Sequence, residues 1–252
     1  MVYNSLTDVP HNLREGIDWL IALKGTDGEK NLAAMGSALY DLLADKPVGK
    51  KVLPALEQIK PITKQFLEKP GLKGHWSVKR LLGRFSEPMN KTIFMWFKHQ
   101  WGYYASDYEN IIQTEGVKLK DMVENLGKVV HGTEKFLDDI KNPDEYKSAY
   151  SSEATWDASC AKNPEACAMV LVGIAPMLYA GLLCLWNASD DAAEKWLVIN
   201  ANERFEKLLK ALDYKEPDCK DNLSAAAVRK ALCSLDNSVD ILYDLAGFWA
   251  FY

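Results

Sequence analysis

The stretch ACAMVLVGIAPMLYAGLLCLW, residues 166–186, decides the fold of this chain. It runs for 21 residues without a charge, which is long enough to cross a bilayer. No basic residue adjoins either end, and two aspartates follow at 190–191, whereas membrane helices carry Lys or Arg at their cytoplasmic end. We therefore predict a helix, kinked or divided at Pro176, that is buried all round in a large helical core. The alternative is a membrane span.

The rest of the chain also has the apolar spacing of amphipathic helices. These stripes occupy 13–21, 32–42, 53–66, 122–140, 196–212, 225–233 and 239–248, and a shorter helix is predicted over 77–85. Asn163, Ser189 and Ser224 are placed to cap helices. No run alternates long enough to predict a strand. The pattern predicts an all-α fold, an irregular multi-helix bundle around 166–186.

The composition is that of an ordinary globular protein, with 252 residues, 48% hydrophobic and 26% charged. We predict a single helical domain over 1–252, with two lobes joined near 142–165 as the alternative. The N-terminus lacks the basic start and long apolar run of a secretory signal. The chain ends in GFWAFY, although soluble tails are usually polar. This predicts a fragment of a longer protein.

The net charge of −5 argues against nucleic acid as a partner. One segment of the chain is nevertheless strongly basic. Residues 46–101 contain 12 basic and 3 acidic residues. This window is either a solvated helix face or a patch for an acidic partner. The partner-binding candidates surround the loop 69–75, where Arg80 and Arg84 share a helix face. They are Lys69, Lys73, His75, Trp76, Lys79, Arg80 and Arg84. If Trp76 is instead a core residue, the cluster is only a solvated rim.

No motif in the sequence indicates a catalytic, metal or cofactor site. The four histidines form no zincin pair, and no glycine-rich phosphate loop or nucleophile elbow is present. The motifs therefore predict no enzyme and no cofactor. An active site assembled from scattered residues is the alternative.

Five cysteines allow two disulfides and one free thiol. Cys160 can fold back over the first turn of a helix to reach Cys167. Cys219 and Cys233 flank the predicted helix 225–233, which a short linker can span. Cys184 lies in the apolar run and is predicted to be a buried free thiol. The alternative is five reduced cysteines in a cytosolic protein.

Three glycosylation sequons begin at Asn90, Asn187 and Asn222. Their number is too small to decide the compartment of the protein.

Several longer strings resemble one known family. They are NLREGIDWLIALKG (12–25), ALYDLLADKPVG (38–49), SAYSSEATWDASC (148–160) and NPEACAMVLVGIAPMLYAGLLCLW (163–186). Together they are similar to the variant erythrocyte surface antigens of Babesia parasites. The likeness runs from the first residues to at least residue 186, so it covers most of the chain.

The resemblance implies a non-enzymatic antigen domain on the surface of the infected red cell. Such antigens vary to escape host antibodies and adhere to a host endothelial receptor, which can be a protein or a glycan. The resemblance also implies a partner antigen subunit and a C-terminal membrane anchor, and we expect that anchor to lie outside these 252 residues. The dense cysteine region of the family is missing too. The alternative function is an intracellular helical interaction or scaffold protein of the parasite.

Overall fold

The computed structural model describes residues 2–86, 104–193, 200–220, 223–235 and 237–252. These residues contain two isolated β-bridges and no strand, so the all-α prediction is confirmed. The helices are α1 (Leu13–Lys24), α2 (Gly28–Ala44), α3 (Pro54–Leu67), α4 (Trp76–Ser86), η1 (Ala105–Asp107), α6 (Ile111–Thr114), α7 (Leu119–Ile140), α8 (Trp156–Ser159), α9 (Pro164–Ala193), α10 (Ala201–Ala211), α11 (Ala225–Leu232), η2 (Cys233–Leu235), α12 (Ser238–Leu245) and α13 (Phe248–Phe251).

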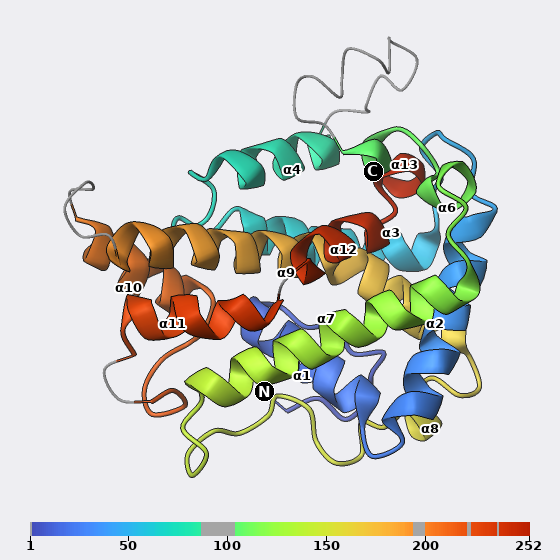
Figure 1. The fold of residues 1–252 in the computed structure, drawn as a ribbon. Coiled ribbons are helices and arrows are strands. Elements are labelled where there is room, and N and C mark those ends of the chain that lie inside the picture. Colours follow the sequence, from blue (N-terminus) through green and yellow to red (C-terminus); the bar gives the residue numbers. More distant parts are fainter. Residues whose placement is uncertain (1, 87–103, 194–199, 221–222, 236) are drawn as a thin grey trace.

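The central element is α9, which runs through the middle of the bundle with the other long helices around it (Figure 1). It is continuous over 30 residues and carries Pro176 inside it. Helices α2, α3, α10, α11 and α12 all contact it. The prediction of a central buried apolar helix is therefore confirmed, and the division at Pro176 is not seen.

Among the described residues, α9 is also the one helix long and apolar enough to cross a membrane, with a mean hydropathy of 2.2. Within its most apolar window, 89% of the residues are buried in the molecule. A core helix of a soluble protein passes the same test of length and hydropathy. The structure therefore accounts for its apolar composition by helix packing alone.

Local capping explains where several helices begin. The amide of Ala166 donates to Oδ1 of Asn163 at 3.3 Å, and the amide of Ala227 donates to Oγ of Ser224 at 3.2 Å. Both caps were predicted. Ser189 was predicted to start a helix but lies buried inside α9, so that prediction is wrong. Its hydroxyl donates to the carbonyl of Trp186, within the same helix.

Two extended segments fasten the ends of the described chain to the bundle. Near the N-terminus, the amide of Tyr3 donates to the carbonyl of Ala149 at 2.8 Å. Near the C-terminus, the amide of Gly49 donates to the carbonyl of Trp249 at 3.0 Å. Residues 248–252 are all buried, so the aromatic run GFWAFY belongs to the hydrophobic core.

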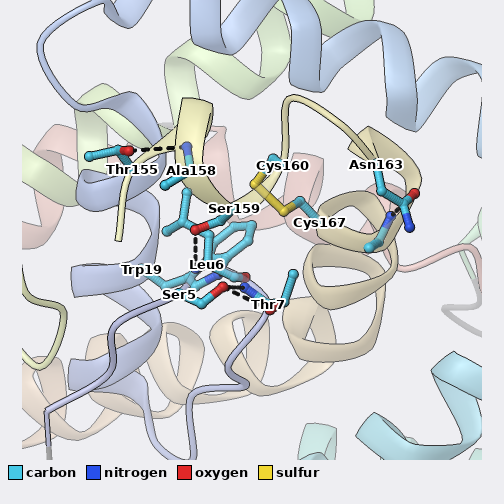
Figure 2. Close-up of a disulfide and its surroundings, with 11 residues drawn as sticks. Ser5, Leu6, Thr7, Trp19, Thr155, Ala158, Ser159, Cys160, Asn163 and Cys167 are labelled. Carbon is cyan, nitrogen blue, oxygen red and sulfur yellow. Dashed lines mark hydrogen bonds between the residues drawn. A yellow bond between two sulfur atoms is a disulfide. The ribbon is translucent and has the colours of Figure 1, made fainter. Parts of the chain in front are cut away.

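A disulfide fixes the turn between α8 and α9 (Figure 2). Cys160 and Cys167 are bonded with their Cα atoms 5.8 Å apart, as predicted from their spacing. Beside them, Oγ of Ser159 accepts a hydrogen bond from the amide of Leu6 at 3.0 Å. The indole of Trp19 donates to the carbonyl of the same leucine at 2.8 Å. The N-terminal segment is thereby held against the start of α9.

Candidate functional site

A groove of about 720 Å³ lies beside the predicted binding loop. We call it the Trp76 groove. Its walls are the loop before α4, the last turns of α9 and the middle of α10. The side chain of Trp76 is 58% exposed, which excludes the alternative that it is a core residue. An indole exposed at the edge of a groove is typical of binding anchors.

His75 ties the loop to α9. Its Nε2 accepts a hydrogen bond from Nδ2 of Asn187 at 2.9 Å, and its Nδ1 lies 2.7 Å from Oγ of Ser77. Burial lowers the pKa of His75, and the nearby positive charge of Arg204 lowers it further. The imidazole is therefore neutral at pH 7, and its two contacts fix the turn that precedes Trp76, the first residue of α4.

Ser77, His75 and Asn187 have the residue types of a nucleophile, a base and an orienting amide. Ser77, however, is 2% exposed, so its hydroxyl is not open to a substrate. Cys184 also lines the groove, but burial raises the pKa of its thiol to about 12. A thiol with that pKa stays protonated and is a poor nucleophile. Neither Ser77 nor Cys184 is therefore an accessible nucleophile.

The charges that line the groove are mixed. Asp190 pairs with Arg229 at 2.6 Å, and Asp191 lies 3.9 Å from Arg204. Lys207 pairs with Glu203 at 2.6 Å. Positive and negative groups therefore largely compensate each other at this surface. Among the described residues that line the groove, a polyanion would find no row of free cations.

Arg80 and Arg84 were predicted to face a partner, and this prediction is wrong. Both guanidinium groups turn toward Asp107 of η1, at 2.7 Å and 2.5 Å respectively. Asp107 is fully buried and also accepts a hydrogen bond from Tyr243. Because a buried carboxylate needs compensating charge, Arg84 is held in the interior and Arg80, whose side chain is 20% exposed, is held at its edge.

The other candidates divide into two groups. Lys73 and Lys79 are exposed beside Trp76, as a binding role requires. Lys69 is half-buried, and its Nζ donates to the carbonyl of Ala211 at 2.9 Å. The structure therefore leaves Trp76 with two exposed lysines rather than a cluster of five cations.

The predicted bridge between Cys219 and Cys233 is wrong, because both are free cysteines. Residues 218–220 pair with the end of α7: the amide of Lys220 donates to the carbonyl of Ile140 at 3.0 Å. This pairing holds Cys219 in the interior, where burial raises the pKa of its thiol to about 11. Cys233 is exposed, and its Sγ contacts the carbonyl of Arg229. Cys184 is free and buried, as predicted.

The sequons at Asn90 and Asn222 lie outside the described residues. The third is part of α9, where the amide nitrogen of Asn187 is engaged by His75. The hydroxyl-bearing residue of that sequon, Ser189, is fully buried. A glycan at Asn187 would require the end of α9 to unfold.

The sequence could not show that residues 75–77 meet α9 at Asn187, because 112 residues separate His75 from Asn187. The one local indication of this site in the sequence is the run His75-Trp76-Ser77, which places a histidine and a serine on either side of a tryptophan. Within the described residues, no group of three or more His, Cys, Asp or Glu side chains has the arrangement of a metal site.

Comparisons of the chain with protein-family models, with curated proteins and with solved structures find no match.

Proposed function

We propose that this chain is a non-enzymatic surface antigen domain of a Babesia parasite, displayed on the infected red cell and active in adhesion to host endothelium. The resemblance of four long strings supports the family. The observation that carries the adhesive role is Trp76, 58% exposed at a groove of about 720 Å³. The Cys160–Cys167 bridge is in keeping with an oxidising compartment.

The proposed partner is a host endothelial protein rather than an acidic glycan. The groove combines Trp76 and Arg204, two residue types that are enriched at protein interfaces, with paired charges of the kind found at an interface rim. Two of the arginines that a sulfated glycan would use are directed to Asp107 instead. A partner antigen subunit would use the same kind of surface, and host antibodies would select for variation around it.

The adhesive role is tested by Trp76→Ala binding to cultured endothelial cells. Loss of this indole is expected to weaken binding at least about tenfold, as hot-spot tryptophans do. Trp186→Ala is the matched control, because Trp186 is also exposed but does not line the groove. Unchanged adhesion of folded Trp76→Ala would refute the role of the groove. Competition by heparin without loss in the Trp76 variant would favour the glycan.

Display on the red cell is tested separately. Trypsin is added to intact infected cells, and the domain is then detected with a specific antibody. Removal of the domain without cell lysis supports surface display. Full protection, with cleavage after lysis, would contradict it.

An intracellular scaffold of the parasite is the second candidate, and the free cysteines favour it. Cys184, Cys219 and Cys233 are unpaired, and Cys233 is exposed. An exposed thiol persists more readily in a reducing compartment. In that case the protein is protected in intact cells, and the Cys160–Cys167 bridge is reduced in extracts that are alkylated at once.

A further inference from the structure

A second cavity, of about 430 Å³, lies at the opposite end of α9 from the Trp76 groove. It is formed by the turn between α1 and α2 and by the segment 148–157, which runs into α8. Its volume is within the range of small-molecule sites. We call it the Trp156 cavity, after the tryptophan in its wall.

Hydrogen bonds fix the walls of this cavity. Nδ2 of Asn31 donates to the carbonyl of Lys24 at 3.0 Å. The hydroxyl of Tyr150 donates to the carbonyl of Asp8 at 2.6 Å. Oγ1 of Thr155 accepts from the amide of Ala158 at 3.3 Å (Figure 2). A site held in this way needs little reorganisation when a ligand binds.

Three polar side-chain groups in the wall have no hydrogen-bond partner within the described part of the chain. Asn31 is 6% exposed, and its buried Oδ1 has no hydrogen-bond partner. The indole N–H of Trp156, a residue 4% exposed, donates to none of the described groups. Asp27 precedes α2 but makes no capping bond through its side chain. Buried polar groups normally have partners, so the Asn31 oxygen indicates a ligand that donates to it. The exposed Asp27 carboxylate and the Trp156 N–H line the same cavity and are open to that ligand.

The lining defines the chemistry of that ligand. No Lys, Arg or His is among the described residues of the wall, so an anion would be poorly held. Asn31 and Asp27 need donors, while Trp156 needs an acceptor. Thr26 and Ser152 add hydroxyls that can do either, and Ile21 and Ala154 add an apolar strip. A neutral ring that carries both hydroxyl groups and C–H faces matches all of these features.

We propose that the Trp156 cavity binds a neutral saccharide, with Asn31 Oδ1 and the Asp27 carboxylate accepting from its hydroxyls and the Trp156 indole donating to one of its oxygens. The apolar strip packs on the C–H face of the sugar ring. This site is separate from the Trp76 groove and does not depend on its function.

The test is titration of the isotope-labelled chain with D-galactose, D-glucose, D-mannose and N-acetyl-D-glucosamine, followed by amide NMR. At least one sugar should give saturable shifts confined to residues 21–31 and 148–157. N-acetylneuraminate, an anionic sugar, should give none. Failure of all four neutral sugars, or preference for the anion, would overturn the proposal.

Variants then test the assigned groups. Asp27→Ala removes a surface carboxylate without a capping bond, and it should weaken sugar binding about three- to tenfold. Glu29→Ala is the matched control, since Glu29 is exposed in the first turn of the same helix but does not line the cavity. Trp156→Phe keeps an aromatic ring and removes the N–H, with a similar expected loss. Equal affinity of the wild type and a folded Asp27→Ala variant would refute the site.

Discussion

Asp107 shows how one buried carboxylate can draw two arginines, predicted to bind a partner, into ion pairs within the fold. Its oxygens lie within 2.7 Å of Arg80 and Arg84, and the carboxylate is fully buried. From the sequence, the spacing of the arginines predicted a shared helix face, which is correct. What the spacing could not show is that a short 3₁₀ turn more than 20 residues away supplies the opposite charge, because that contact is tertiary.

Asp107→Asn is therefore expected to lower the free energy of unfolding by about 3–5 kcal/mol, since it leaves buried cations without their charge partner. Urea unfolding followed by circular dichroism measures the loss. Glu124→Gln is the control, because it breaks an exposed pair with Lys128 at 2.9 Å. That change should cost about 0.5 kcal/mol or less. Similar values for both variants would contradict the role given to Asp107.

Two other acids, the buried Asp18 and the half-buried Asp244, make stability depend on pH. Burial raises the pKa of Asp244 to about 7 and that of Asp18 to about 6. A carboxyl whose pKa is raised by folding binds its proton more tightly in the folded chain. Its contribution to stability is therefore complete below the unfolded pKa, near 4, and is lost as the pH rises through 6 and 7.

We expect the unfolding free energy to be higher at pH 5 than at pH 8. Asp244→Asn should reduce that difference by about 2–4 kcal/mol, because one unit of pKa corresponds to 1.36 kcal/mol. Chemical denaturation at a series of pH values gives the slope. A wild-type protein whose stability increases from pH 5 to pH 8 would show that these carboxyls are ionised in the fold.

At the scale of elements, α9 determines how closely its neighbours approach. Gly173 faces α3, where a Cβ atom would come within 2.3 Å of Cγ2 of Ile59. Thr63 of α3 also donates to the carbonyl of Gly173 at 2.7 Å. The two helices meet at this glycine because any side chain would separate them.

Gly173→Ala is expected to destabilise the fold by about 1–3 kcal/mol, as overpacking does. Gly127→Ala in α7 is the matched helical glycine, with no atom within 4 Å of the added Cβ. It should stabilise by about 0.5–1 kcal/mol, because alanine is the better helix former. Thermal unfolding of both variants shows whether each substitution raises or lowers the stability of the fold. Opposite signs from those stated would contradict the close contact of α3 and α9.

The elements themselves were largely predictable from the sequence. The apolar run at 166–186 predicted the buried centre, and Asn163 and Ser224 predicted two helix starts. Ser189 misled because a serine can cap a helix or satisfy its hydroxyl inside one, and the choice depends on packing. The Trp76 groove could be predicted only in its loop, because its other wall comes from helices far along the chain.

At the scale of the whole molecule, the oxidation state of the cysteines tests both the disulfide in the fold and the compartment in which the protein resides. Mass spectrometry of unreduced, denatured and alkylated protein should find label on Cys184, Cys219 and Cys233 only. Loss of the Cys160–Cys167 bridge should cost about 2–3 kcal/mol in the chain-entropy model, since the closed loop is short. Label on all five cysteines of protein taken directly from infected cells would contradict an oxidising compartment.

The order in which the bundle closes follows from what covers α9. Helices α10, α11 and α12 all contact it, and residues 248–252 are buried in the same core. A ribosome therefore delivers the most apolar segment well before the helices that shield it. During that interval, chaperones and membrane-targeting factors compete with the unfinished chain for α9. Burial of α9 thus depends on how soon residues 201–252 follow it from the ribosome.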